Sequence, residues 1–503
     1  MAIAKFLSCT CILYLVSDFM QFTAIQRIMG LLLMLSSITM LPPVGIALLY
    51  GDGGLTAFLL SFSWTLAAGF FIWLPVKSVR KELRLRDGFI VVVLFWLVLG
   101  LSGSLPLYLS DKPFISFTDS VFESLSGLTT TGATILVGID ELPHSILFYR
   151  QQLQWLGGMG IIVLAVAVLP MLGVGGMQLY RAETPGPMKD TKLTPRITET
   201  AKALWYIYLG LTLACSLAYW LAGMNLFDAV GHSFSTVAIG GFSTHDDSIG
   251  FFHSPLIEVV AVIFMFLAGI NFALHFVAWR NLNIKHYIHD PEAVSYFTIL
   301  LVASAITTGY LYYSGVIEGD FWDTLHHGVF QTISIGTTTG FTTTAYFDWP
   351  TFLPVMLIFI SFIGGCAGST GGGMKVIRFM LLLRQGKREI QRLIHPNAQI
   401  AIKVGGKSMP PRVVESVWGF FAAYVAAFSI MLLILMMTGL DQVTAFSAVA
   451  ACMNNMGPGL GEVGAHYANI SDTAKWVLAF AMLLGRLEIF TLLVILTPEF
   501  WRR

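Results

Sequence analysis

The sequence feature that most constrains the fold is a string of threonine and glycine that occurs twice. It reads SIGTTTGFT at Ser334–Thr342 and SGLTTTGAT at Ser126–Thr134, in each case between long apolar runs. Glycine tolerates the positive-φ conformations that turn successive backbone carbonyls to one side, and the threonines add hydroxyl oxygens. A ring of such oxygens can replace the water shell of an ion. The strings therefore predict the lining of a narrow cation path.

Composition indicates where such a path would lie. The chain is 56% hydrophobic and only 12% charged, with a mean hydropathy of +0.74. Soluble proteins carry roughly 25% charged residues, so we expect a polytopic membrane protein. A net charge of zero excludes a bulk basic surface for nucleic acid. The cysteines are scattered and odd in number, which favours small core residues over a disulfide framework or a metal site; they are Cys9, Cys11, Cys215, Cys366 and Cys452.

Two further strings complete a fourfold internal repeat. Each repeat has an apolar span, a short amphipathic helix, a glycine string and a second span, with near-equal spacing of Gly132, Gly240, Gly340 and Gly457. Unrelated glycine turns between transmembrane hairpins are the simpler explanation, but near-equal spacing argues against them. Irregular backbone at membrane depth is tolerated only where it is buried in protein or lines a cavity. We therefore predict an all-α polytopic membrane protein with four span–pore helix–filter–span repeats around a pseudo-fourfold pore.

The expected boundaries follow from this repeat. Two extra N-terminal spans and a basic loop occupy residues 20–86, and the four pore repeats occupy residues 87–202, 203–290, 291–412 and 413–503. The predicted spans are Ile28–Tyr50, Leu55–Val76, Phe89–Leu109, Gln152–Leu172, Ala203–Ala222, Pro255–Trp279, two within Tyr296–Arg384, Val414–Gly439, and a last one from about Ala474.

Residues 1–19 do not fit the repeat. Their apolar run, Phe6–Val16, is too short to cross a bilayer. It is either a signal-like segment or a stretch upstream of the true start. We expect the second, a non-native extension with translation starting at Met20.

Charge predicts the orientation. Lysine and arginine crowd the loops between repeats, at residues 77–86, 181–202, 280–285 and 384–412. The positive-inside rule places these loops in the cytoplasm and the glycine strings on the outer side. An even number of spans, two plus eight, then leaves Met20 and Arg503 both cytoplasmic. The loops beside the strings carry mainly acids, either to concentrate cations or as ordinary solvated loops; the few basic residues there are Lys112, Arg150 and Lys475.

The four strings, the segment QWLGGMG at Gln154–Gly160 and the leading pair of spans resemble the TrkH-type potassium uptake proteins of the Trk/Ktr/HKT cation transporter superfamily, over Met20 to Arg503. The resemblance implies that one glycine per repeat marks a potassium filter, and glycine in all four repeats is the state associated with potassium selectivity. The fourth string departs from the threonine-rich form, with Asn454, Asn455 and Pro458. The implied filter residues are Thr130, Thr131, Gly132, Ala238, Ile239, Gly240, Thr338, Thr339, Gly340, Asn455, Met456 and Gly457.

A second glycine-rich stretch, residues 364–373, interrupts the apolar run Phe352–Leu383. Each glycine costs a helix interior roughly 1 kcal/mol, so we expect the helix to break. Close helix packing through Gly364 and Gly368 is the alternative. The resemblance implies instead an intramembrane gating loop beneath the filter, made of Gly364, Gly365, Gly368, Gly371, Gly372, Gly373 and Lys375, with Arg486 near the pore.

Arg486 is also a functional candidate without the resemblance, because it lies inside the last apolar run. Pairing with Glu488 is disfavoured, since residues two apart on a helix do not face each other. The histidines of the predicted pore helices, His232, His326 and His327, belong to no cluster with metal-ligand spacing. We interpret them as hydrogen-bonded structural residues.

These observations predict a gated, potassium-selective uptake protein of the bacterial inner membrane, with K⁺ as the transported ion, no cofactor and no enzymatic activity. A proton- or sodium-coupled symporter working by alternating access is one alternative, but that class usually shows two inverted halves. An intramembrane enzyme is another, but no nucleophile–base or metal set is visible. The resemblance further implies a homodimer and a cytosolic nucleotide-binding (Rossmann-type) regulatory subunit. The basic inner loops suit such a docking face, and membrane lipid headgroups explain them nearly as well.

Overall fold

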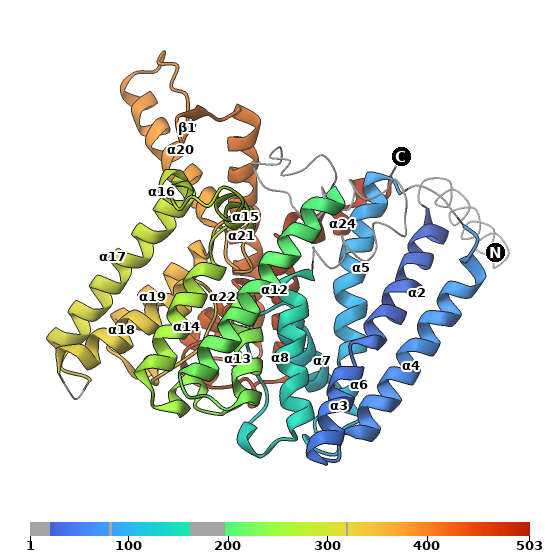
Figure 1. The fold of residues 1–503 in the computed structure, drawn as a ribbon. Helices are drawn as coiled ribbons and strands as arrows, with labels where there is room; N and C mark the ends of the chain where they lie inside the picture. The colour runs from blue at the N-terminus through green and yellow to red at the C-terminus, as the bar shows by residue number, and fades with distance from the viewer. Residues whose placement is uncertain (1–20, 80–82, 161–196, 318–319, 503) are drawn as a thin grey trace.

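The computed structural model describes residues 21–79, 83–160, 197–317 and 320–502 (Figure 1). The predictions for residues 1–19, for the end of the span Gln152–Leu172 and for the basic stretch up to residue 196 lie outside these ranges. The described chain is predominantly helical. Its two strands, β1 (Lys403–Val404) and β2 (Lys407–Ser408), form one antiparallel hairpin.

Six helical segments are long and apolar enough to cross a membrane, and two bent helix pairs raise the number to eight within the described residues. The predicted spans are confirmed at these places, with ends that differ by several residues at most. The six segments are built from α2 (Phe22–Ile38) with α3 (Leu41–Tyr50), α4 (Leu55–Trp73) with the 3₁₀ turn η1 (Leu74–Val76), α5 (Leu85–Gly103) with α6 (Leu105–Tyr108), α12 (Ile197–Leu221), α17 (Pro291–Ser314) and α21 (Pro411–Met437).

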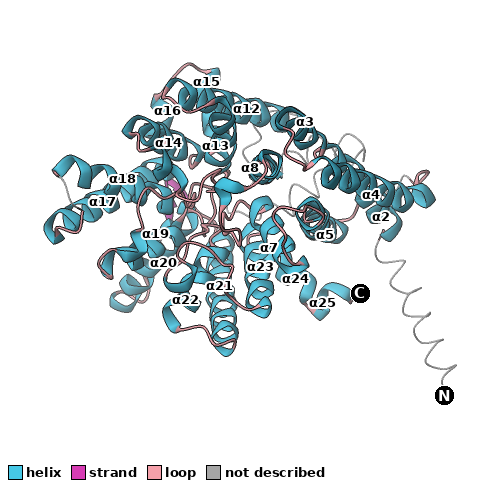
Figure 2. Cartoon of the chain, turned by 90° about the horizontal axis from the view of Figure 1, so that it is seen from below, coloured by secondary structure: helices cyan, strands magenta, loops and turns pink. Residues whose placement is uncertain are grey.

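Four shorter helices point their C-terminal ends at the centre of the molecule, where Figure 2 shows a group of loops surrounded by helices. They are α7 (Phe117–Leu128), α13 (Leu226–Ala238), α18 (Phe321–Gly336) and α22 (Gln442–Met453). Each begins at a side chain that accepts hydrogen bonds from the free N–H groups of the first turn; these caps are Ser116, Asn225, Asp320 and Asp441. We call these four the short central helices.

The helices that follow the second and fourth central loops are broken, which corrects two predicted continuous spans. Residues 255–279 form α14 (Pro255–Ala268) and α15 (Phe272–Arg280), bent by 94°. The chain after Ala474 forms α23 (Asp472–Arg486) and α24 (Phe490–Leu496), bent by 116°, and ends in α25 (Pro498–Trp501). In the first repeat, α8 runs from His144 to Gly158.

The first break has a local cap and a partner that is distant in the chain. Asn271 caps α15 by accepting a hydrogen bond from Ala273 N, and the glycine-rich stretch 364–373 fills the gap. Gly269 O accepts from Cys366 N at 2.9 Å, and Phe272 N donates to Gly368 O at 3.0 Å. In the second break, Glu488 and Ile489 both have positive φ. Apolar composition alone does not reveal either kink.

The predicted interruption of the run Phe352–Leu383 is confirmed. Helix α19 (Phe352–Ile363) ends before the glycine-rich stretch and α20 (Val376–Ile394) begins after it. Gly364 and Gly368 therefore do not share a helix face, and the helix-packing alternative is wrong. In Figure 1, α20, β1 and α16 (Lys285–His289) lie at the same end of the molecule as α24 and the C-terminus of the chain. The connections at the opposite end contain 3₁₀ turns at Ile139–Glu141, Ser248–Phe252, Tyr346–Asp348 and Gly461–Val463.

Candidate functional site

The four central loops share one backbone conformation. In each loop two residues, separated by one other residue, have positive φ, which reverses the direction of successive carbonyls. The pairs are Thr130 (55°) with Gly132 (80°), Ile239 (56°) with Gly241 (79°), Thr338 (70°) with Gly340 (86°), and Asn455 (52°) with Gly457 (93°).

The loops close a ring in chain order. In each pair the second residue is a glycine. Its α-carbon lies so close to a backbone carbonyl of a neighbouring loop that no side chain fits. A β-carbon would lie 2.2 Å from Gly240 O if added to Gly132, 2.1 Å from Thr339 O on Gly241, 2.1 Å from Met456 O on Gly340, and 2.6 Å from Thr131 O on Gly457. Segments more than three hundred residues apart thus meet around one centre.

This geometry corrects the predicted register of the second loop. The glycine equivalent to Gly132, Gly340 and Gly457 is Gly241, whereas Gly240 has no positive φ and presents its carbonyl to Gly132. Ala238 is the last residue of α13 and precedes the turn. The string Ala-Ile-Gly-Gly offers two adjacent glycines, so only the backbone conformation distinguishes them.

The loops are buried and held from behind by different side chains. Thr129 Oγ1 and Thr131 Oγ1 are 2.7 Å apart, as are the hydroxyls of Thr337 and Thr339. In the second loop Gln154 replaces the threonines: its Nε2 donates to Gly240 O at 2.6 Å and its Oε1 accepts from Phe242 N. Thr129, Thr131 and Gln154 are fully buried.

The divergent fourth loop has its own supports. Asn455 Nδ2 donates to Thr131 Oγ1 and to Met482 O, both at 3.0 Å. Asn454 Nδ2 donates to Ser361 Oγ at 2.9 Å, and its Oδ1 accepts from Tyr424. Amide side chains therefore tie the fourth loop to the first loop and to the surrounding helices.

One face of the ring opens into a cavity of about 330 Å³. Residues of all four loops line it, among them Gly132, Gly241, Gly340 and Gly457, together with the acids Asp246 and Asp247. The lining is mixed: apolar side chains such as Phe242 and Phe347 alternate with oxygen-bearing side chains such as Thr342 and Ser243. A hydrated cation could gather there before it loses water to the ring.

A buried ion pair supports this cavity and was not anticipated. Arg150, predicted as a loop residue, lies on α8 and is 1% exposed; its Nε donates to Glu123 Oε1 at 2.8 Å. Its other nitrogens donate to Ser243 O and Thr134 Oγ1, both at 3.1 Å. Glu123 also accepts from Ile135 N. The pair joins the first and second loops. Its signal in the sequence was Glu123, an acid in the middle of an amphipathic helix whose other acid, Asp119, lies in the first turn.

His245 stands between two acids beside the same cavity. Its Nδ1 is 2.5 Å from Asp140 Oδ1 and its Nε2 is 3.2 Å from Asp228 Oδ2. Burial acts to lower the pKa of His245, but the hydrogen bonds with Asp228 and Asp140 and their negative charges outweigh it and raise the pKa above its ordinary value. His245 therefore links Asp140, which follows the first loop, to Asp228 of α13, and the raised pKa favours its charged form.

On the opposite face of the ring lies the glycine-rich stretch 364–373. Thr370 Oγ1 donates to Val237 O at 3.0 Å. Gly372 N donates to Thr338 Oγ1 at 2.7 Å, and Gly373 N donates to Asn454 O at 3.0 Å. The stretch thus contacts the bases of the second, third and fourth loops.

Arg486 completes the contact on the side of the first loop. Its NH1 donates to Thr130 Oγ1 at 3.1 Å and to Thr370 O at 3.2 Å, and its NH2 donates to Gly157 O. Glu488 pairs with Arg378. Arg486 therefore links the first loop to the glycine-rich stretch.

Two side chains fix the ends of that stretch. Lys375, which has a positive φ, donates from Nζ to Gly371 O. Glu292 Oε1 accepts from Ala367 N at 2.7 Å and from Ile377 N at 3.2 Å. The role of Glu292 could not be predicted, because this residue lies near the start of helix α17, a position where acids are common.

The interpretation of the histidines as hydrogen-bonded residues is confirmed for His232 and His327, and the structure adds that His326 and His327 lie in a cluster with Glu258. His232 is hydrogen-bonded through both nitrogens, to Asp228 O and Ser243 Oγ, each at 2.9 Å. His326 Nε2 lies 3.2 Å from a carboxylate oxygen of Glu258, and His327 is close by. Glu258 belongs to another repeat, so spacing along the chain could not reveal this cluster.

Comparison with known proteins gives consistent results. A family model described as TrkH, cation transport protein, matches residues 54–502. The Trk system potassium uptake protein TrkH of Vibrio parahaemolyticus is 59% identical over 487 residues, which cover 96% of this chain and all of that protein. The protein of the same name from Escherichia coli K12 is 54% identical, with 96% of this chain and all of that protein covered.

A solved structure matches as well. The crystal structure of the potassium transporter TrkH from Vibrio parahaemolyticus superposes with a TM-score of 0.88 at 56% sequence identity, covering 96% of this chain and all of the other. Similarity at this level extends over the whole helical arrangement. Together with the apolar helices, it establishes a multi-pass membrane protein.

Proposed function

The chain belongs to the TrkH family of cation transport proteins, and from this membership we propose that it takes up potassium across the bacterial inner membrane through a gated pore. The observation that carries the proposal is the closed ring of four loops, with carbonyl and hydroxyl oxygens gathered between an outer cavity and the glycine-rich stretch. The transported ion is K⁺, and no cofactor is invoked.

In this proposal the ring is the selectivity filter. Its residues are the predicted ones, except that the second loop is shifted by one residue and contributes Ile239, Gly240 and Gly241. Each loop belongs to one of four repeats around a pseudo-fourfold axis, at residues 87–202, 203–290, 291–412 and 413–503. The C-terminal ends of the short central helices carry partial negative charge, which favours a cation at the centre. Buried loops that support one another keep the oxygens at a spacing suited to a dehydrated ion.

The glycine-rich stretch is the proposed gate. Hydrogen bonds of Thr370, Gly372 and Gly373 to the loop bases support a position directly under the filter. Arg486 adds a positive charge there, which opposes the passage of a cation. Since only a few hydrogen bonds hold the stretch, a partner could shift it between blocked and open positions.

The orientation follows from charge. The end of the molecule that carries α16, α20 and the β1–β2 hairpin is rich in lysine and arginine, which supports a cytoplasmic location for this end. The outer cavity then faces the periplasm, and both chain ends are cytoplasmic. We propose that the basic cytoplasmic surface binds a nucleotide-binding regulatory subunit, beside membrane lipid headgroups, and that the protein forms a homodimer.

The proposal is tested with the purified protein in liposomes. Under opposing K⁺ and Na⁺ gradients, we expect a reversal potential close to the potassium equilibrium potential. A reversal potential that shifts with the proton or sodium gradient at fixed K⁺ would instead indicate ion-coupled symport. Absence of K⁺ flux in correctly inserted protein, with and without the regulatory subunit, would overturn the proposal.

A further inference from the structure

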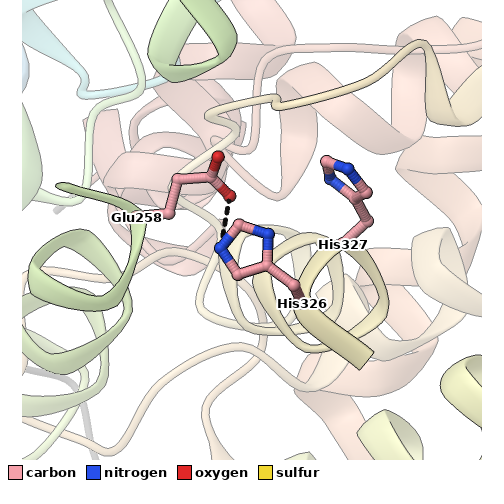
Figure 3. Close-up of side chains that lie close together, drawn as sticks. All are labelled: Glu258, His326 and His327. Atoms are coloured by element: carbon pink, nitrogen blue, oxygen red, sulfur yellow. Dashed lines mark ion pairs between the residues drawn. The ribbon is translucent and has the colours of Figure 1, made fainter. Parts of the chain in front are cut away.

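We propose that Glu258, His326 and His327 form a zinc-binding site between α14 and α18, separate from the potassium path. One ligand atom from each of the three residues lies within 4.8 Å of the others. Figure 3 shows the carboxylate of Glu258 reaching the ring of His326, with the ring of His327 alongside. The residues come from the second and third repeats and are assembled only in the folded protein.

Glu258 offers a buried carboxylate oxygen to a cation. The residue is 5% exposed and lies in the first turn of α14. Its Oε2 and the Nε2 of His326 are 3.2 Å apart, yet both atoms are buried and neither has a hydrogen-bond partner of acceptable geometry in the described chain. Buried polar atoms are almost always satisfied, because an unpaired one is costly. A metal ion between them would satisfy both atoms.

The two imidazoles are held as metal ligands usually are. A ligating histidine is commonly oriented by a hydrogen bond from its other ring nitrogen. His327 Nδ1 is bonded to Thr343 Oγ1 at 3.1 Å, and the backbone of Pro255 interacts with His326. The ring centroids of His326 and His327 are 5.3 Å apart. Both rings are thus positioned by neighbours outside the cluster.

The geometry suits zinc. Zinc bonds of about 2.0–2.2 Å in a tetrahedron place ligand atoms about 3.4 Å apart, near the distance between Glu258 and His326. The ligand atom of His327 lies within 4.8 Å of the other two ligand atoms, and a rotation of its side chain would bring it closer to them. Two imidazoles and one carboxylate favour zinc over magnesium or calcium, which prefer oxygen ligands. Water would fill the fourth position.

Access and charge also favour a cation. The side chain of His326 is 23% exposed, so an ion can enter from the surface. Asp323, one helical turn away, acts electrostatically on both histidines. Thr343, which is bonded to His327, lines the outer cavity. Zinc would therefore fasten two repeats together beside the entrance without lying in the ion path.

The test uses the full-length protein in detergent after chelator treatment. Calorimetric titration with Zn²⁺ should give one site per chain, and Zn²⁺ should raise the unfolding temperature with concentration, because the ion binds only the folded state. Glu258→Gln and His326→Gln should each weaken binding more than the roughly 10–100-fold lost with a second-shell partner. His395→Gln, at an exposed histidine after α20, is the matched control and should bind zinc as the wild type does.

A second variant protects the test against misfolding. His326→Cys supplies another zinc ligand and should retain the site, and Co²⁺ should then give the visible absorption of a tetrahedral thiolate complex. The proposal is overturned if the wild type binds no Zn²⁺, or if folded Glu258→Gln and His326→Gln bind it as tightly as the His395→Gln control. A His326→Cys protein that folds but gives no tetrahedral Co²⁺ spectrum also overturns it.

Discussion

Substitution of Gly340 by serine tests the filter most directly. Gly340 has φ +86°, a conformation that costs an L-residue roughly 1–2 kcal/mol. The new β-carbon would also stand 2.1 Å from Met456 O, where ordinary contact begins at 3.4 Å, so this carbonyl must retreat by about 1.3 Å. A free-energy change of about 1.4 kcal/mol alters an equilibrium tenfold. We therefore expect the K⁺/Na⁺ permeability ratio to fall by roughly tenfold or more.

Gly315→Ser is the matched control. Gly315 ends α17 in the same repeat, and its φ of +63° imposes similar backbone strain. No atom lies within 4 Å of the position of its β-carbon, so the substitution displaces nothing. Both variants should lose stability through backbone strain, with the larger loss in Gly340→Ser, but only Gly340→Ser should lose selectivity.

The assay is the reversal potential under bi-ionic K⁺/Na⁺ conditions, measured on protein reconstituted in planar bilayers. Expression and elution volume verify that each variant folds. An unchanged permeability ratio in folded Gly340→Ser would refute the assignment of the ring as the filter. An equal fall in both variants would show that selectivity depends on general stability and not on the displaced carbonyl.

Three further outcomes are expected. Deleting Gly371–Gly373 shortens the gate by up to about 10 Å of extended chain and should raise K⁺ flux per inserted molecule while preserving selectivity; lower flux in liposomes would contradict the gate. Glu123→Gln leaves Arg150 buried and unpaired, which costs about 3–5 kcal/mol and should lower the unfolding temperature strongly, whereas Glu389→Gln in an exposed pair should change it little. The pKa of His245 is raised in the folded protein, so the stability that this residue contributes is complete below its unfolded pKa of about 6.5 and is lost as pH rises through its folded pKa. The difference in unfolding temperature between wild type and His245→Asn should therefore shrink as pH rises. A difference that does not depend on pH would contradict this.

The sequence predicted the elements whose determinants are local. The short amphipathic helix expected before the first glycine string is α7 (Phe117–Leu128), and it was predictable because its amphipathic pattern and the cap at Ser116 lie within one segment. The interruption of the chain at residues 364–373 was equally predictable, since six glycines in an apolar run prevent a continuous helix. Periodicity and glycine content express local preferences, and these decide where a helix begins and ends.

The features that could not be predicted from the sequence depend on contacts between segments that are separate in the chain. The break between α14 and α15 depends on backbone bonds with the stretch 364–373, which lies about a hundred residues further along the chain. The pairs Arg150–Glu123 and Glu258–His326 likewise join different helices. A charge in an apolar helix signals that a partner exists, but the identity of that partner depends on the assembled fold.

The second loop shows this limit most sharply. Its string offers Gly240 and Gly241, and either could have supplied the glycine of the ring. The choice is made by Gln154, a residue of the first repeat, because its amide donates to Gly240 O and accepts from Phe242 N. These two bonds leave Gly241 as the residue that turns against Thr339 O, where only glycine fits. The register of one loop is therefore set by a side chain of another repeat, and a repeat read in isolation cannot contain that information.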